Sequence, residues 1–598
     1  MRSLLFCFLL THLLPLHQVN AQAVVKKDSI EKKSLTKKAF KEGLKLISTT
    51  PKDTIEGEKS INPFLEHSGK IIRHIAIEHV GFEKSIYDSA RKVDKFVTKA
   101  ANFLHQDTRE KTIRQHLFIS ENNALNPHRL ADNERFLRDR DFILDSRIVV
   151  TPIPNTDSVD LLVITRDVFS LGATIGGSFP TAPEIGIYDA NFDGRAQRLE
   201  FNTLTDVDRT PNFGYAFLYR KSSLLGSLAN LELQYTQLNN GRSFGEENEF
   251  AWVARINRPL VSPYSRMAGG FEMSQNWSQN VYAKPDTSFL SYRYNIFDSW
   301  LGYNIGINKE VNDRSRHFLS VRYFDGTYLD QPDQPEYQED KDYNTAVGYL
   351  SEFTFYRQDY YKTRYVFGFG RTEDIPYGIN LGITGGYVKI LSIGRPYAAL
   401  KFNYAKASKE GNFYRLSFQA GSYSRNNQLE DVVLQPGASY VTKLVQIKKL
   451  KARGYIAATY TQLFNQTVND FLTIGRKDIP GFSLDSLEAD QRLSLHGESV
   501  LFFPRSLFGF RFAPFAAVDM VYVSNCATCS VPKTNFIGIS GGLRTRNENL
   551  IFGTMEVKFT YIPQNGNGDS KFVIGFKENI RVKNTGTFVK PPSLINYN

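Results

Sequence analysis

Residues 538–542 of this 598-residue chain have a spacing that serine hydrolases use. They read Gly-Ile-Ser-Gly-Gly, which matches the GxSxG pattern of a nucleophilic serine. That chemistry needs the serine on a strand-to-helix turn and a histidine further along the chain. No histidine follows Ser540, and the surrounding residues are typical of a strand. We therefore expect Ser540 to be a structural residue.

His496 and Glu498 are a second candidate pair. They stand two residues apart, so a strand would present both on one face, where the carboxylate could orient the imidazole. The sequence offers no nucleophile or metal-ligand set for such a pair to serve. It also has no HExxH or Walker pattern. We expect no catalytic residue, no metal site and no cofactor.

The first residues have the pattern of an export signal, which bears on the cysteines. Arg2 precedes an apolar stretch at 4–16, and small residues at 19–23 offer a cleavage site. The signal is predicted at 1–21. After it, only Cys526 and Cys529 remain, a spacing found in redox pairs and half zinc sites. No second CxxC or nearby histidine pair supports zinc, and export favours a small loop disulfide over a redox pair.

Composition limits the class of protein. Hydrophobic residues make up 41% of the chain, which is too many for a disordered polymer, and the formal charge is +11. After the signal there is no apolar run near the ~18 residues that a spanning helix needs. Tyrosines (31) and phenylalanines (45) are abundant. Many aromatic residues without spanning helices favour an all-β protein whose rings meet lipid at its rims.

Residues 22–68 are predicted to be a basic linker. Eight lysines crowd residues 26–45. Two interpretations remain open: a solvated tail, or a contact with anionic lipid headgroups or an acidic partner. Nucleic acid is not an expected partner of an exported protein.

Residues 69–167 have a mixed pattern. Isoleucines at 71–77 predict a strand, and helices are expected at 92–104, at 108–117 and from Asn126-Pro127 onward. Two strands follow, at 142–151 and 159–165. The order strand, helices, strand, strand predicts a small α+β domain.

From Arg166 onward, apolar and polar residues alternate with period two. Residues 555–561 are an example, in which Met555, Val557, Phe559 and Tyr561 alternate with Glu556, Lys558 and Thr560. Segments of about ten residues match tilted strands that cross a bilayer, where a sheet must close on itself. We count roughly 16 to 20 candidate spans. We predict an antiparallel transmembrane β-barrel of about 16 strands at 168–582 and a tail at 583–598. A soluble sandwich or propeller is the alternative, but no blade-length repeat supports it.

Several stretches resemble the BamA/TamA superfamily of outer-membrane assembly and translocation proteins, in the form found in Bacteroidota. Three lie in the small domain and resemble the first strand, second helix and last strand of that family's periplasmic POTRA module. Two resemble turns of its barrel, and the last resembles its barrel end. They are Gly69 to Ile75, Asn126 to Arg138, Asp157 to Asp167, Asn191 to Gln197 (NFDGRAQ, with Ala196 in place of the family's second Gly), Gly370 to Gly378, and the chain from Gly475 onward.

The resemblance also implies a lid loop folded into the barrel, with the motif (V/I)RG(F/Y). Here the motif reads Ile479-Pro480-Gly481-Phe482, so proline replaces the arginine. In the family that arginine meets acidic and aromatic positions on the next two strands, where Glu498 and Asp519 stand in this chain. A guanidinium could bind either carboxylate with charge-assisted hydrogen bonds, whereas proline cannot donate. The same acids could instead be ordinary polar residues of the barrel interior.

The resemblance implies an outer-membrane protein with one POTRA-like module in the periplasm. Its implied role is to insert or translocate other proteins by strand templating, without chemical catalysis. Its expected partners are outer-membrane lipid, unfolded outer-membrane or exported clients, and other assembly subunits. Two alternatives stay open: a passive transport pore, and a scaffold subunit of a larger complex, which Pro480 favours.

Overall fold

The computed structural model describes most of the chain after residue 56. The described residues are 57–80, 106–178, 181–238, 247–305, 314–468, 472–475, 478–480, 482, 484–507, 509–524, 534–547, 550–551, 553–565, 569–580 and 589–597. None of the helices in these ranges is both long and apolar enough to cross a bilayer. The signal peptide and most of the basic linker predicted above lie outside the described residues.

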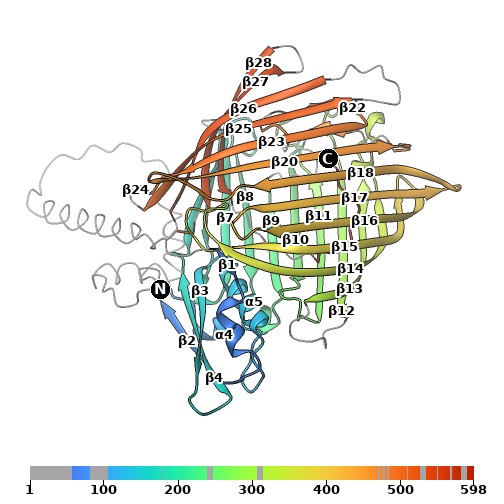
Figure 1. Cartoon of the computed structure of the whole chain (residues 1–598). Helices are drawn as coiled ribbons and strands as arrows, with labels where there is room; N and C mark the ends of the chain where they lie inside the picture. Colours follow the sequence, from blue (N-terminus) through green and yellow to red (C-terminus); the bar gives the residue numbers. More distant parts are fainter. Residues whose placement is uncertain are drawn as a thin grey trace, which may run out of the picture.

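The N-terminal part forms a small α+β domain, drawn in blue in Figure 1. Its sheet has the order β2-β4-β3, with β2 parallel to β4 and β3 antiparallel to it. The side chain of Asn126 accepts hydrogen bonds from the first turn of α5, so the helix begins where the sequence predicts. The elements are η1 (Asn62–His67), β2 (Ile71–Val80), α4 (Glu110–Arg114), α5 (Pro127–Arg138), β3 (Ile143–Pro152) and β4 (Ser158–Asp167).

The rest of the described chain forms one sheet of 23 strands. Three of them, β1 (Glu58–Lys59), β19 (Val445–Ile447) and β24 (Ser506–Leu507), are two or three residues long. The other twenty are β5 (Leu171–Ser178), β6 (Ala182–Asp189), β7 (Gln197–Thr205), β8 (Phe213–Lys221), β9 (Asn230–Thr236), β10 (Glu249–Arg258), β11 (Met267–Ser278), β12 (Arg293–Ile305), β13 (Ser315–Asp330), β14 (Ala346–Thr363), β15 (Glu373–Ile390), β16 (Ile393–Ala407), β17 (Phe413–Arg425), β18 (Gln428–Val441), β20 (Leu450–Phe464), β23 (Gln491–Phe502), β25 (Phe510–Ser524), β26 (Thr534–Asn547), β27 (Thr554–Asn565) and β28 (Asp569–Ile580).

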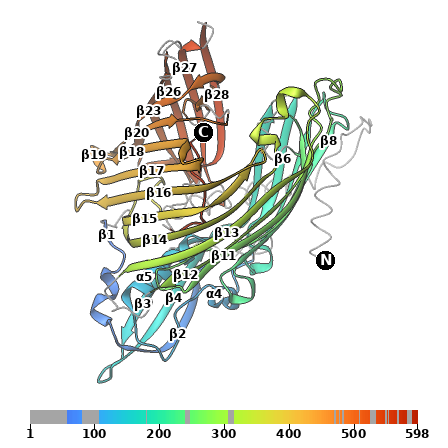
Figure 2. The ribbon, with the colours of Figure 1, turned by 90° about the vertical axis from the view of Figure 1, so that its right-hand side faces the viewer.

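These twenty strands form an antiparallel meander in which each strand pairs with the next. The meander curves round, so that the red C-terminal strands stand opposite the cyan strands near β6 and β8 (Figure 2). No register joins β28 to β5 among the described residues; near these edges there is one isolated bridge, between Phe169 and Leu550. We call the unjoined edges the seam and the concave side of the sheet the lumen.

The two faces of the sheet differ in the way that the period-two pattern predicts. On β14, Tyr349 and Phe353 are 60% and 42% exposed, whereas Leu350 and Glu352 between them are 3% and 7% exposed. Other strands repeat this alternation, so large apolar side chains cover the convex face. Such a face is expected in a bilayer and is costly in water.

The strand count is higher than the predicted 16, and the sheet is not closed by a ladder at the seam. Several early strands are only seven to nine residues long, such as β5, β7 and β9. In β5 three of the eight residues are glycine, so its alternation is weak and a count from periodicity misses it. The predicted long loop after β20 also contains a small hairpin, β21 (Leu472–Ile474) with β22 (Leu484–Ala489).

Candidate functional site

The lid segment, residues 472–489, lies against the lumen wall. Ile479 is fully buried and Phe482 is 4% exposed. The Phe482 ring lies 5.2 Å from that of Phe536 on β26. Ile479 fills the space beside Gly538, where a Cβ atom would lie 2.8 Å from its Cγ2. Apolar contacts with β26 therefore hold the two motif residues that match the family pattern.

Polar contacts hold the same segment on β23. Ser494 donates to Asp478 Oδ1 at 2.7 Å, and Arg492 donates to the Thr473 carbonyl at 2.6 Å. The Arg492 guanidinium also lies 3.5 Å from the Asp478 carboxylate. Pro480 stands between the two residues that make the apolar contacts, Ile479 and Phe482; its ring nitrogen has no proton to donate. Gly481 lies outside the described residues.

The two acids expected near a lid arginine, Glu498 and Asp519, bind other side chains of the lumen wall. Arg544 on β26 binds Glu498 with both terminal nitrogens, at 2.6 and 2.7 Å, and reaches Glu556 with Nε at 2.7 Å. Asp519 accepts from His496 Nδ1 at 2.6 Å. Sequence reasoning missed Arg544, although residues 536, 538, 540 and 542 of that strand face the lumen and 544 continues their alternation.

The remaining residues with candidate chemistry lie apart from one another. Ser540 is in the middle of β26 and shares a hydrogen bond with Thr560 at 3.0 Å, so it is not on a strand-to-helix turn. His496 and Glu498 face the lumen together, but each binds a different partner. Cys526 and Cys529 lie outside the described residues, so the disulfide stays a prediction.

Residues 589–597 also lie in the lumen; we call them the strap. Its backbone oxygens accept hydrogen bonds from side chains on β13, β16 and β23. Because β13, β16 and β23 are not neighbours in the sheet, a single short segment can contact all three only from the concave side. The sequence leaves two places open for the tail, the periplasm and the seam, whereas its described part contacts the lumen wall.

Helix α5 docks the small domain on the sheet through buried charges. Arg138 binds Asp374 of β15 with two nitrogens and Glu134 of its own helix at 2.7 Å. Lys362 of β14 binds Glu134 at 2.7 Å. All four side chains are at most 12% exposed. Burial alone would raise the pKa of Glu134, but Lys362 and Arg138 outweigh it and lower that pKa to about 2.

Two turns singled out in the sequence form the rest of this contact. Arg371, in the Gly370 to Gly378 turn, donates to the carbonyls of β3 residues Ile143 and Leu144 at 3.3 Å. In the NFDGRAQ turn, Asp193 binds Arg109 at 2.6 Å. Ala196 has φ of 53°, in the left-handed region where glycine is favoured. That conformation explains why the resembling family has glycine at this position.

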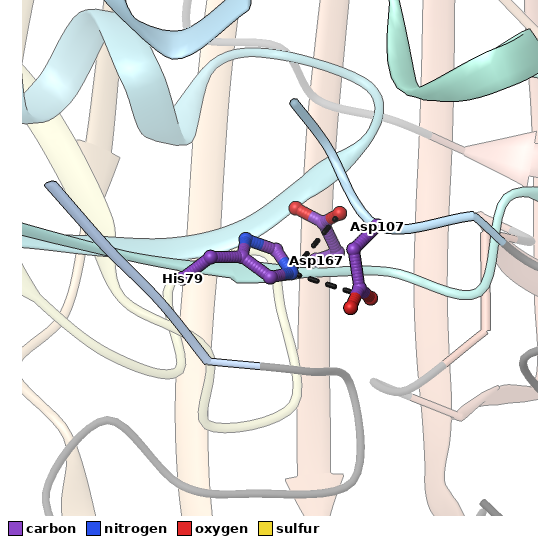
Figure 3. Close-up of side chains that lie close together, drawn as sticks. All are labelled: His79, Asp107 and Asp167. Carbon is purple, nitrogen blue, oxygen red and sulfur yellow. Dashed lines mark ion pairs between the residues drawn. The ribbon is translucent and has the colours of Figure 1, made fainter. Parts of the chain in front are cut away.

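A third contact joins the end of β4 to this turn, and Figure 3 shows its ionisable core. His79 Nε2 lies 3.3 Å from Asp107 and 3.6 Å from buried Asp167. Thr108 donates its N–H and its hydroxyl to Asp167, both at 2.7 Å, and Asn191 binds Thr108. Burial raises the pKa of Asp167 to about 6, although His79 and Thr108 act in the opposite direction. The ligand atoms of the three side chains lie within 4.8 Å of one another.

The arrangement supports non-covalent work better than a reaction. The carboxylates of the lumen wall are held in ion pairs, and the Ser540 hydroxyl has a hydroxyl partner. What the fold leaves available is backbone at the outer edge of β28, which pairs only with β27 among the described residues. A strand edge with free N–H and C=O groups is a template for another strand.

No protein-family model matches the chain, and no curated protein matches it. Among solved structures it is similar to BamA from Haemophilus ducreyi lacking POTRA domains 1–3 (11% identity, TM-score 0.30, covering 93% of this chain and 95% of that one). It is also similar to CdiB from Acinetobacter baumannii (11%, TM-score 0.38) and from Escherichia coli (10%, TM-score 0.36), each covering 93% of this chain and 99% of the other. Similarity at this level carries no functional inference.

Proposed function

We propose that this protein is an outer-membrane assembly or translocation factor that offers the seam to a client polypeptide. The observation that carries the proposal is the outer edge of β28, which no ladder joins to β5 among the described residues, in a sheet whose convex face is apolar. In a bilayer, each backbone N–H or C=O group without a hydrogen-bond partner costs several kcal/mol, because no water is present to bind it. An incoming strand would satisfy them, so the seam attracts strands.

The small domain supports the same role from the periplasmic side. Its strand–helix–helix–strand–strand order and its β2-β4-β3 sheet suit the POTRA-like module that the sequence resembles. The outer edge of β2 is partly occupied, because Ile72 exchanges hydrogen bonds with residues 122 and 123. We therefore assign strand pairing to the seam, and to the small domain the positioning of the client.

A scaffold role remains as the second candidate, and one observation favours it. The lid has Pro480 instead of arginine, and Arg544 already occupies Glu498. Because Arg544 of the lumen wall already binds Glu498, that carboxylate is not available to hold a movable lid. A passive pore fits less well, because the lid segment and the strap both lie in the lumen.

Depletion of the protein, followed by quantitative proteomics of the outer membrane, tests the assembly role. We expect other barrel proteins to decline over the following generations, before growth stops. An unchanged barrel population would exclude a general assembly role and leave the scaffold.

A crosslink across the seam separates a working seam from a static one. Cysteines replace Ala173 and Phe576, with Cys526 and Cys529 changed to serine. Oxidation should stop client insertion, and reduction should restore it; the single Ala173→Cys variant is the control. Full activity of the oxidised, crosslinked protein would argue for the scaffold.

A further inference from the structure

The strap crosses the lumen wall over a long path. Val589 packs against Phe318 of β13 and Tyr356 of β14, in a cluster that includes Leu260. Eight residues later, the Tyr597 carbonyl accepts a hydrogen bond from Arg492, the second residue of β23. At about 3.1 Å per residue, an extended segment of this length spans roughly 25 Å. The strap is therefore an extended peptide bound along a wall, and it has no secondary structure of its own.

Its most buried residues recur every third position, and Leu594 and Tyr597 add partly buried apolar contacts to the cluster around Ile595. Val589, Pro592 and Ile595 are buried, whereas the residues between them are intermediate or exposed. A spacing of three is that of a polyproline II helix, and Pro591-Pro592 favours this conformation. Aromatic grooves bind such segments in other recognition systems, and here Tyr356 and Tyr397 line the wall.

Cations on the wall bind the strap backbone. Arg322 donates to the Pro592 carbonyl at 2.8 Å, and Lys401 donates to the carbonyl and the hydroxyl of Ser593 at 2.8 and 2.9 Å. Each cation is fixed by an acid of the wall: Arg322 by Asp298 and Lys401 by Glu352. Each acid partly neutralises the cation that it binds, and one N–H group of that cation remains directed at the lumen, where it donates to the strap. The two carbonyl contacts do not depend on the sequence of the bound peptide, whereas the contact with the Ser593 hydroxyl does.

One wall glycine is fitted to the strap. A Cβ atom on Gly421 of β17 would lie 2.8 Å from Ile595 Cδ1 and 2.9 Å from the Tyr397 hydroxyl. That hydroxyl in turn accepts the Ile595 N–H at 3.0 Å. At Ile595 the wall therefore binds the main chain of the strap through Tyr397 and leaves space for its side chain at Gly421, the two features of a peptide-binding site.

We propose that the lumen wall is a binding groove for an extended, polyproline-type peptide with apolar side chains three residues apart, and that the strap is its resident occupant. The groove adjoins the lid: Ile595 shares a core cluster with Ile479 and Phe482, and Arg492 binds both the strap and the lid segment. A client segment that displaces the strap would therefore also release the lid. That last step rests on the function proposed above; the binding itself does not.

Peptide binding in trans tests the groove. The chain is ended after residue 588, purified in micelles and checked for folding by its heat-dependent gel migration. The probe is a fluorescent peptide of residues 589–597, followed by anisotropy. We expect it to bind the shortened protein at least tenfold more tightly than the full chain, whose groove is occupied. An Ile595→Asp peptide should lose at least tenfold in affinity, while Lys590→Gln, which makes the same change of charge at an exposed strap residue, should bind like the parent.

No binding to a folded, shortened protein, or equal binding of the two altered peptides, would overturn the proposal. If the shortened chain does not fold, the same two substitutions are made in the full chain carrying Ser593→Cys, with Cys526 and Cys529 changed to serine. Maleimide labelling at 593 should be at least tenfold faster with Ile595→Asp than with Lys590→Gln, and equal rates would reject the groove. Peptide binding combined with an unchanged outer membrane on depletion would retain the groove and reject the assembly role.

Discussion

Arg138 is the residue on which the docking of the small domain depends most. It lies between Glu134 and Asp374, and all three side chains are less than 10% exposed. Removing one partner from a buried ion pair leaves a charge that neither water nor protein compensates. The contact should therefore fail when this one side chain is lost, although the paired network itself adds little net stability.

We expect Arg138→Ala to lower the free energy of unfolding of the small domain by about 3–5 kcal/mol. Urea denaturation, followed by protease sensitivity within residues 106–167, measures the change. Arg73→Ala is the matched control, because Arg73 is 62% exposed and pairs with Asp160 at the surface. Similar losses for both variants would show that burial does not decide the effect.

Asp167 should make the junction sensitive to pH. Its folded pKa of about 6 lies above the unfolded value of about 3.9, so folding favours the protonated carboxyl. The stabilisation is complete below about pH 4 and is lost as the pH rises through 6; two pKa units correspond to about 3 kcal/mol. His79 and Asp107 are the ionisable groups that face it. Hydrogen exchange at residues 106–114, corrected for intrinsic rates, should show this fall.

The control for this pH dependence is a pair of substitutions. Asp167→Asn should remove most of the dependence between pH 4 and 6, and Asp157→Asn, at an exposed turn position, should leave it intact. If Asp167→Asn kept the full dependence, another group would be responsible.

Among elements, the NFDGRAQ turn has a strict backbone requirement. Gly194 has φ of 64°, and a Cβ atom there would lie 2.3 Å from the Asp107 carbonyl oxygen. Alanine would meet both left-handed strain, roughly 1–2 kcal/mol, and this clash. We expect Gly194→Ala to lower the urea midpoint clearly, while Gly385→Ala, with no atom within 4 Å of the added Cβ, should not. Equal midpoints would mean that the turn can shift without cost.

Local signals predicted β2, β3, β4 and the start of α5, whereas the helix expected at 108–117 is shorter, Glu110–Arg114, and the one expected at 92–104 lies outside the described residues. Asn126-Pro127 marks the start of α5, and β-branched runs mark β3 and β4, because caps and strand propensity act within a few residues. The Arg544–Glu498 pair could not be read in the same way. These residues are 46 positions apart, on strands separated by β25, so only the register brings them together. The strap has no periodic signal at sheet or helix spacing, and its place depends on the wall.

At the scale of the whole molecule, the apolar convex face is the feature that supports the proposed membrane location. Phe353 is 42% exposed on that face, near the middle of β14. Phe353→Arg should lower the unfolding free energy in lipid vesicles by about 2–4 kcal/mol, the cost of arginine facing lipid near the bilayer midplane. Phe353→Leu, which keeps an apolar surface, is the control. If both variants unfolded alike, the convex face would be in contact with water.

The meander also determines the order of assembly. Each long ladder joins neighbouring long strands of the chain, and most of them, although not β20–β23 with its lid loop, form by closing a short loop at low entropic cost. The two edges of the seam belong to residues about 400 positions apart, and contacts between such distant residues form slowly. We expect the hairpins to form early and the edges to approach last, so that a newly made molecule spends its longest folding interval as an open sheet. Chaperones that shield strand edges would act in that interval.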